Sequence, residues 1–281
     1  MDPERLPRMR VNPYHGSMPS SRKQWWETLF DDKYLVTYVD RITEAAGQAQ
    51  LEFLRNTLPL PPEAAILDLA CGYGRLSVPL AQEGYRVTGF DFSEYLLDIA
   101  QQRAQAAGLA VPFVQGDMRH LDFENEFDAI INIFTSFGYF ETVEEDRAVL
   151  EGVHRGLKSK GYFLMDFANS PKAISWLYEN GTIDRETGEL VSQKTETLSN
   201  GLVVNQVERL DVGSLRWQMK RTWREGGRER SYFTNVRMYF LAELLQLITE
   251  AGLRVERVYG DFDASPYQAD SKRILIVSRK G

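Results

Sequence analysis

Residues 65–91 read AILDLACGYGRLSVPLAQEGYRVTGFD, and the predicted fold is built outward from them. An apolar run that contains one acid, Asp68, predicts a strand buried on both faces. Two glycines, Gly72 and Gly74, then permit a tight turn in which bare backbone can approach a ligand. A short helical pattern and a second apolar run ending in Asp91 complete a β-α-β unit. Such a unit predicts a ligand crevice at the carboxyl ends of its strands.

Three ligand classes use a crevice of this kind, and the glycine turn separates them. A phosphate-binding loop requires GxxxxGK[ST], which the chain lacks. A dinucleotide site requires GxGxxG, but Ser77 occupies the position of the third glycine. The run LDLACGYGRLS instead resembles the first motif of class I S-adenosylmethionine-dependent methyltransferases, commonly (V/I)LDxGCGxGxxS. Asp91 matches the acid that accepts hydrogen bonds from both ribose hydroxyls in that family.

The resemblance implies a fold and a cofactor. The implied fold is α/β, a doubly wound Rossmann-like sheet of seven strands with an antiparallel last strand, formed by residues 62–170 and 240–281. The implied cofactor is S-adenosyl-L-methionine, and no metal is expected. The candidate cofactor-binding residues are Asp68, Ala70, Gly72, Gly74, Arg75, Asp91, Phe92, Asp117, Met118, Ile133, Phe134 and Tyr34.

The triplet Gly116-Asp117-Met118 follows a third predicted strand, residues 111–115. It resembles the family's next motif, in which the acid accepts a hydrogen bond from the adenine amino group and the following residue packs on the base. An aspartate at a strand end is also a common cap for the next turn. We favour the adenine role because the triplet falls at the family's spacing.

Residues 127–134 predict the fourth strand, and the segment after it distinguishes acceptors within this family. Amino-directed DNA methyltransferases resemble one another in a (D/N)PPY motif at this point, and cytosine-C5 enzymes carry Pro-Cys; the chain has neither. The single thiol, Cys71, lies in the cofactor turn, so no cysteine remains as a nucleophile. Residues 134–140, FTSFGYF, instead resemble a segment of small-molecule methyltransferases, including amino-sugar N-methyltransferases. We therefore expect Tyr139 to line the acceptor site.

Composition limits the class of protein. With 281 residues, of which 43% are hydrophobic, the chain can bury a large core. A formal net charge of −7 disfavours nucleic acid as a partner, since nucleic-acid binding relies on a cationic surface. No apolar run approaches the roughly 20 residues of a membrane span, and the N-terminus lacks the apolar region of a signal peptide. We expect a cytoplasmic protein with neither a membrane nor a nucleic-acid partner.

Residues 1–61 predict an N-terminal helical cap. Aromatic and aliphatic side chains recur at helical spacing across residues 25–42, which predicts one helix. Its aromatic side either packs on the core or closes over the cofactor. Core packing is favoured for Trp25 and Trp26, and both roles stay open for Tyr34 and Tyr38.

Residues 171–239 predict an inserted antiparallel β meander. β-Branched and aromatic runs across residues 189–240 are broken by turn signals 11 to 15 residues apart, which indicates four strands. Charged and apolar residues alternate along these strands, as in a sheet with one buried face. We expect the meander to act as a lid over the crevice or as a homodimer element.

The chemistry of the cofactor limits what the protein must supply. Its sulfonium makes the methyl carbon electrophilic, so the protein chiefly has to hold a nucleophile in line. A base is needed only where the nucleophile arrives protonated. The candidate catalytic residues are Tyr139 and Tyr267. Further candidate bases are Asp261, Asp263, His15 and His154.

These observations predict methyl transfer to a small-molecule acceptor by in-line displacement, with nitrogen and oxygen both open as the acceptor atom. The alternative is a non-catalytic subunit that binds S-adenosylmethionine and regulates or docks a partner. A nicotinamide oxidoreductase is a weaker third class, because the glycine pattern departs from its fingerprint.

Overall fold

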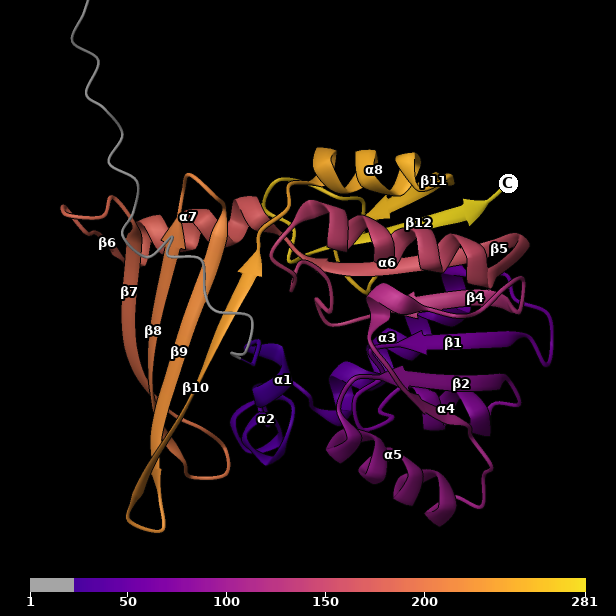
Figure 1. The fold of residues 1–281 in the computed structure, drawn as a ribbon, viewed down its shortest axis with the longest axis horizontal. Coiled ribbons are helices and arrows are strands. Elements are labelled where there is room, and N and C mark those ends of the chain that lie inside the picture. Colours follow the sequence, from indigo (N-terminus) through magenta and orange to yellow (C-terminus); the bar gives the residue numbers. More distant parts are fainter. Residues whose placement is uncertain (1–22) are drawn as a thin grey trace, which may run out of the picture.

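The computed structural model describes residues 23–281, which form two β-sheets joined and covered by helices (Figure 1). The larger sheet has seven strands in the order β11-β12-β5-β4-β1-β2-β3. β12 is antiparallel to both of its neighbours, and the other pairs are parallel, which confirms the predicted sheet. Its strands are β1 (Ala65–Leu69), β2 (Arg86–Asp91), β3 (Phe113–Gln115), β4 (Phe127–Asn132), β5 (Leu157–Ala168), β11 (Leu253–Tyr259) and β12 (Arg273–Lys280).

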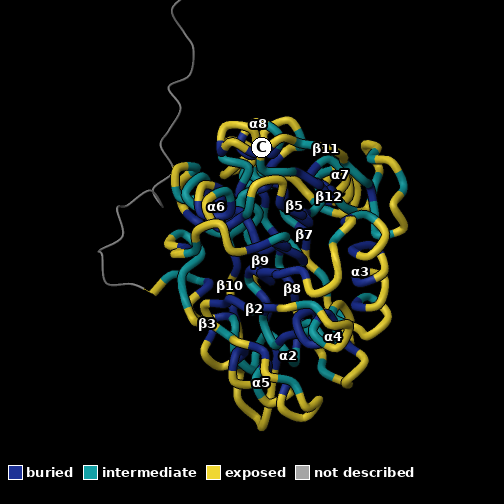
Figure 2. Tube along the Cα trace, turned by 90° about the vertical axis from the view of Figure 1, so that its right-hand side faces the viewer, coloured by how far each residue is buried: buried dark blue, intermediate teal, exposed yellow. Residues whose placement is uncertain are grey.

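Helices cover both faces of the larger sheet. Leu67 and Leu69 of β1 pack in one apolar cluster with α6 and α8, whereas Ile66 packs on the opposite face with α3 and α4. Because both faces are covered, β1 is buried at every position, as a parallel strand requires. Figure 2 shows this burial in the strands, with exposed residues on the outer helices and loops. The helices are α3 (Glu44–Thr57), α4 (Ser77–Gln82), α5 (Glu94–Ala106), η1 (Met118–His120), α6 (Val143–Gly156) and α8 (Leu241–Glu250).

The smaller sheet is the predicted meander, with one strand more than expected. Its five antiparallel strands follow the order β10-β9-β8-β7-β6. The additional strand, β6, spans two residues and pairs with the start of β7, too short a run to give a period in the sequence. The strands are β6 (Thr182–Ile183), β7 (Leu190–Thr197), β8 (Val203–Asp211), β9 (Arg216–Glu225) and β10 (Arg228–Arg237).

A helix that the sequence analysis did not predict, α7 (Ser170–Asn180), connects the two sheets. Pro171 lies in its first turn, where a missing N–H costs nothing. Leu177 is its one fully buried apolar residue and packs with Leu190 and Leu210 of the smaller sheet. With so few buried positions, the helical period is weak in the sequence.

The single helix predicted over residues 25–42 is wrong, because two short helices occupy this segment. They are α1 (Trp26–Leu29) and α2 (Asp32–Thr37). The chain turns at Asp31, whose carboxylate accepts a hydrogen bond from the N–H of Lys33 at 2.8 Å and caps α2. The pair lies between the two sheets (Figure 1). No helix within residues 23–281 combines the length and the apolar character needed to cross a membrane.

Candidate cofactor and acceptor site

A cavity of about 590 Å³ lies where the carboxyl ends of β1, β2 and β4 face the smaller sheet. Its walls come from three parts of the fold: the turns after these strands, the α1–α2 segment, and the inner face of β8, β9 and β10. The volume is within the range of small-molecule sites. Because the walls derive from both sheets, a ligand that fills the cavity would contact both sheets.

All but one of the predicted cofactor-binding residues line this cavity, and the exception is Gly74. A Cβ on Gly74 would lie 3.1 Å from the Cβ of Ala100 on α5 and 3.4 Å from its Cα. The absence of a side chain at Gly74 therefore allows α5 to approach the turn. Gly72, which lines the cavity at φ +54°, is the glycine at which backbone can meet a ligand.

Asp91 presents a fixed, buried carboxylate to the cavity. One oxygen accepts a hydrogen bond from the N–H of Gly72 at 2.7 Å, and the other accepts one from the N–H of Ser93 at 2.9 Å. Burial raises the pKa of Asp91, and these two donors oppose the shift. Each oxygen keeps a lone pair for a further donor, so the group can accept two hydrogen bonds from a diol.

Asp68 joins β1 to the start of α4. Its carboxylate accepts a hydrogen bond from Ser77 Oγ at 2.6 Å, and burial raises its pKa to about 6. This contact explains why serine, and not a third glycine, follows the glycine turn. The side chain of Arg75 is also held by a hydrogen bond, since its guanidinium donates to the side-chain oxygen of Gln50 on α3.

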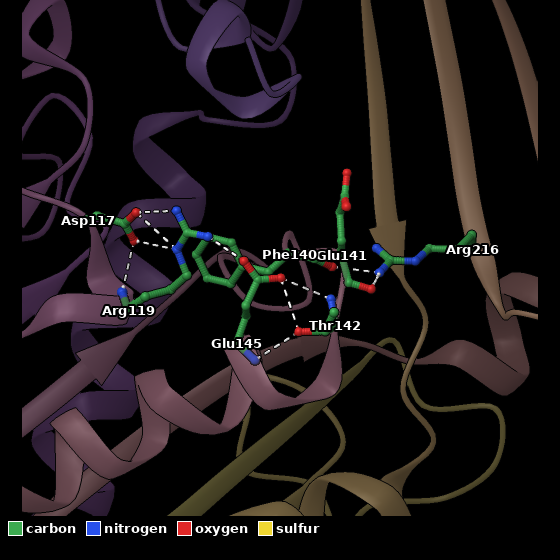
Figure 3. A network of polar contacts seen from close by, with 7 residues as sticks. All are labelled: Asp117, Arg119, Phe140, Glu141, Thr142, Glu145 and Arg216. Carbon is green, nitrogen blue, oxygen red and sulfur yellow. Dashed lines mark hydrogen bonds and ion pairs between the residues drawn. The ribbon is translucent and has the colours of Figure 1, made fainter. Parts of the chain in front are cut away.

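Asp117 lies in a polar network that runs from the cavity to the smaller sheet (Figure 3). Its carboxylate caps η1 by accepting from the N–H of Arg119 at 2.9 Å, and both of its oxygens accept from the Arg119 guanidinium. Burial alone would raise the pKa of Asp117, but the Arg119 hydrogen bonds outweigh it and lower the pKa. The capping role left open by the sequence is therefore present. The adenine role stays a prediction.

The other end of this network holds the loop after β4 against the smaller sheet. Arg119 also donates to Glu145 of α6, and its guanidinium lies 4.5 Å from the centroid of the Phe140 ring. From β9, Arg216 donates to the carbonyl oxygens of Phe140 and Glu141 at 2.6 and 2.7 Å (Figure 3). One wall of the cavity is thus fixed by both sheets.

The turn after β4 carries backbone strain. Phe134 and Thr135 have φ of 73° and 58°, a region that non-glycine residues rarely adopt. The N–H of Phe134 donates to the Asp166 carboxylate at 2.7 Å, and Arg273 joins Asp166 and Thr135 Oγ1 at 2.6 Å each. This pair of charged residues, which the sequence analysis did not identify, holds the strained turn at the cavity.

Aromatic rings form the wall on the α1–α2 side. Tyr139 packs edge-on against Trp25, with 4.8 Å between their ring centroids. The ring centroids of Tyr34 and Tyr38 lie 4.7 Å apart. All four line the cavity, as does the buried Trp26, so core packing and lining coexist in the tryptophans. Burial raises the pKa of Tyr139 and of Tyr34 well above that of a free phenol. Tyr139 therefore presents a neutral phenol to the cavity at neutral pH, and its catalytic role stays a prediction.

The other candidate catalytic residues and bases that lie within residues 23–281 do not line the cavity. Tyr267 donates its hydroxyl hydrogen to Asn169 Oδ1 at 3.1 Å and packs on the core. Asp261 and Asp263 both lie in the loop between β11 and β12. There Asp261 forms an ion pair with Lys272 at 3.0 Å, and Asp263 accepts a hydrogen bond from the N–H of Ser265 at 2.9 Å. His154, in the last turn of α6, lies against Gly252, which follows α8. His15 lies outside the described residues.

Glu208, a carboxylate on β8 that lines the cavity, is a site residue that was not predicted from the sequence. The signal was present in the alternation of VVNQVERLD, residues 203–211, which places Glu208 on the same face as Val204 and Leu210. An acid in an inward row is informative once the faces of a strand are assigned. No group of three or more His, Cys, Asp or Glu side chains within residues 23–281 is arranged to hold a metal ion.

Comparisons with known proteins agree with this geometry. Residues 66–161 match a family model described as a methyltransferase domain. The chain is 27% identical to the dTDP-3-amino-3,4,6-trideoxy-alpha-D-glucopyranose N,N-dimethyltransferase of Streptomyces venezuelae, over 83% of this chain and 91% of that protein. It is 25% identical to a glycine/sarcosine N-methyltransferase of Halorhodospira halochloris, over 89% and 90%. The solved structure of the CcbJ methyltransferase from Streptomyces caelestis superposes with a TM-score of 0.75 at 22% identity, over 91% and 99%.

The sheet order, the glycine turn after β1 and the buried acid at the end of β2 define a Rossmann-like methyltransferase fold. With the matches above, the chain belongs to the class I S-adenosylmethionine-dependent methyltransferases. Its cofactor is S-adenosyl-L-methionine.

Proposed function

We propose that the chain transfers the methyl group of S-adenosylmethionine to the nitrogen of a small amine by in-line displacement. The observation that carries this proposal is the shared cavity: one space of about 590 Å³ is bounded by the cofactor turn and by the inner face of the smaller sheet. A space enclosed by both sheets suits a small acceptor and excludes a duplex. Nitrogen is favoured because the amino-sugar and glycine/sarcosine relatives are named as N-methyltransferases.

The cofactor would be held by the residues around the glycine turn. Asp91 would accept hydrogen bonds from the ribose hydroxyls, and the backbone at Gly72 would approach the ligand closely. Phe92 and Met118 would flank the adenine, with Asp117 beside it. When bound, S-adenosylmethionine supplies an electrophilic methyl carbon on a cationic sulfur.

The aromatic wall would orient the reacting groups. The rings of Trp25, Tyr34 and Tyr139 offer π-faces to a cation, as a sulfonium or an ammonium requires. With both ligands bound, the same rings would exclude water from the space between cofactor and acceptor. Holding two reactants in line contributes roughly 7 to 11 kcal/mol at best, so positioning is the main service of this site.

Transfer of label tests the proposal. The protein is mixed with S-adenosylmethionine labelled in its methyl group and with matched sets of small amines, alcohols and carboxylates. Label on the nitrogen of an amine is expected. Label only on oxygen, or tight cofactor binding without transfer to any set, would contradict N-methylation. The second of these results would favour the alternative of a non-catalytic cofactor-binding subunit.

A homodimer formed through the smaller sheet also stays a prediction. β10 and β6 are the edge strands of that sheet, and unpaired edges invite pairing between copies. Sedimentation at rising protein concentration measures it. A monomer at every concentration would leave the lid as the only predicted role of the meander.

A further inference from the structure

Glu208 is a buried carboxylate on a wall of the cavity that is mostly apolar. It lies on β8 between Val204 and Leu210, which are fully buried on the same face. Across the strands it faces Ser192 of β7 and Met219 of β9. The other residues of the smaller sheet that line the cavity are Trp217, Met219, Thr234 and Val236, and Met238 lines it directly after β10. A charged group placed among such neighbours is expensive unless it has a partner.

Within residues 23–281 no salt bridge neutralises Glu208. One of its oxygens accepts a hydrogen bond from Gln206 Nε2 at 2.6 Å. The nearby guanidinium of Arg221 is used elsewhere: it donates to Glu196 at 3.0 Å and to the carbonyl oxygen of Thr37 at 2.6 Å. Burial raises the pKa of Glu208, although the charges of Lys194, Arg41 and Arg221 oppose the shift. Among the described residues, none of these three cations forms an ion pair with Glu208, although Arg41 also lines the cavity. The carboxylate is therefore desolvated and lacks a direct ionic partner, which a cationic occupant of the cavity would supply.

The arrangement also fixes how this carboxylate is presented. Arg221 donates to Gln206 Oε1 at 2.6 Å, so the amide of Gln206 is turned with its NH₂ toward Glu208. Only one carboxylate oxygen is used by that contact, which leaves the other for a ligand. Gln206 is thus a positioning residue.

Ring contacts connect Arg221, which holds Gln206 beside Glu208, to the turn after β4 that lines the cavity. The Arg221 guanidinium lies 5.3 Å from the centroid of the Tyr38 ring. The centroid of the Tyr38 ring in turn lies 6.3 Å from that of Phe134, which follows β4, and 4.7 Å from that of Tyr34. Glu208 and Asp91 line the same cavity from opposite sheets, so cofactor and acceptor groups can be assigned to different walls.

We propose that Glu208 binds the ammonium group of the acceptor and accepts one proton from it, so that the substrate class is a small amine that is cationic in solution. This inference rests on the proposed function. The step is an acid–base exchange in which R–NH₃⁺ and the carboxylate become R–NH₂ and the carboxylic acid. The freed lone pair then forms the N–C bond to the methyl carbon while the C–S bond breaks and its electrons stay on sulfur. The Glu208 proton returns to solvent when products leave.

The test compares Glu208→Gln with Glu229→Gln. Both variants remove one negative charge from the smaller sheet, but Glu229 is exposed on β10 and does not line the cavity. The protein is loaded with S-adenosylhomocysteine, and calorimetry measures two matched pairs of probes, cyclohexylamine against cyclohexanol and glucosamine against glucose. Each pair differs in one amino group. The wild-type protein and Glu229→Gln should bind at least one amine about tenfold more tightly than its alcohol, and Glu208→Gln should lose that preference.

Either of two results would overturn the inference: an amine preference that persists in Glu208→Gln, or no amine preference in the wild-type protein. Glu208→Gln should also keep its affinity for S-adenosylhomocysteine and melt no earlier than the wild type, because it removes a buried charge that has no direct ion pair among the described residues. If Glu208→Gln does not fold, Glu208→Asp takes its place in the test. This variant keeps the charge but shortens the side chain by one methylene. An undiminished amine preference in Glu208→Asp would then contradict the inference.

The two proposals fail separately. If the amine preference depends on Glu208 but no amine accepts labelled methyl, N-methylation is wrong and the binding role of Glu208 stands. If Glu208→Gln methylates amines as well as the wild type does, the role of Glu208 is wrong and N-methylation stands.

Discussion

At the scale of single residues, two backbone N–H groups hold the Asp91 carboxylate in place before any ligand arrives. Such preorganisation lowers the entropic cost of binding. The carboxylate is buried, so a ligand that donates to it does so out of competition with bulk water.

Asp91→Asn should therefore weaken cofactor binding strongly. The amide keeps one acceptor oxygen but loses the charge, and a hydrogen bond to a charged group contributes about 1.5 to 3 kcal/mol. Calorimetry with S-adenosylhomocysteine should show at least about a tenfold loss of affinity. Asp98→Asn, exposed on α5, is the control and should bind as the wild type does. Unchanged affinity in Asp91→Asn would remove this residue from the site.

Gly72 and Gly74 should respond differently to alanine. Both have φ in the left-handed region, which costs a non-glycine residue about 1 to 2 kcal/mol. A Cβ on Gly72 meets nothing closer than Leu96 at 3.9 Å and points to a position that lines the cavity, so Gly72→Ala should chiefly lose cofactor affinity. A Cβ on Gly74 meets α5, so Gly74→Ala should chiefly lose stability. Denaturant unfolding and calorimetry on both variants measure the contrast, and the reverse pattern would contradict these roles.

At the scale of elements, α6 is tied to the exit of the smaller sheet by a buried carboxyl. Asp146 of α6 accepts a hydrogen bond from the Tyr239 hydroxyl at 2.6 Å. Its other oxygen has no partner within residues 23–281. Burial raises the pKa of Asp146 from 3.8 to about 6, although Arg216 and Arg237 oppose the shift.

The pKa of Asp146 gives a dependence of stability on pH. The folded state binds a proton more tightly than the unfolded chain, so this group stabilises the fold below about pH 4 and loses that contribution as the pH rises to about 6. Asp146→Asn cannot ionise and still accepts from Tyr239. Its unfolding free energy should match the wild type near pH 4 and exceed it by up to about 3 kcal/mol above pH 6. Denaturant titrations across this range measure the difference. The exposed Asp122→Asn should show none, and a gap for Asp146→Asn that closes as the pH rises would contradict the assignment.

At the scale of the whole molecule, the α1–α2 segment joins two apolar clusters. Trp26 packs in the core of the larger sheet, while Leu29, three residues on, packs with Val204, Met219 and Trp223 of the smaller sheet. Because the cavity lies between the sheets, its shape depends on how the α1–α2 segment packs against both of them.

Leu29→Ala should loosen the smaller sheet more than the larger one. Leu29 is 2% exposed, and truncating a buried leucine costs about 2 to 5 kcal/mol. Hydrogen exchange should become faster in β8, β9 and β10 than in β1 and β4, and cofactor affinity should fall less than acceptor affinity. Val203→Ala, at an exposed position of β8, is the control. Equal acceleration in both sheets would mean that α1 does not join them in this way.

Local spacing determined much of this protein. The strand, glycine turn, helix and acid of residues 65–91 follow from neighbours along the chain, because periodicity and turn geometry act over a few residues. For the same reason the positions around Asp91 and Met118 could be placed at one sheet edge, although their contacts with the cofactor stay predictions. The break at Asp31 escaped prediction because the apolar period continues across it and only the cap shows the turn.

Tertiary structure alone decided which distant groups share the cavity. Glu208 lies more than a hundred residues from the glycine turn, and no local pattern states which face of β8 meets the larger sheet. Arg273 and Asp166 hold the strained turn after β4 from neighbouring strands. Tyr267 was a candidate catalytic residue and Gly74 a candidate cofactor-binding residue, but in the folded chain neither lines the cavity. A side chain's spacing is a property of the chain, whereas its surroundings are set by how the two sheets pack, which no short stretch of sequence specifies.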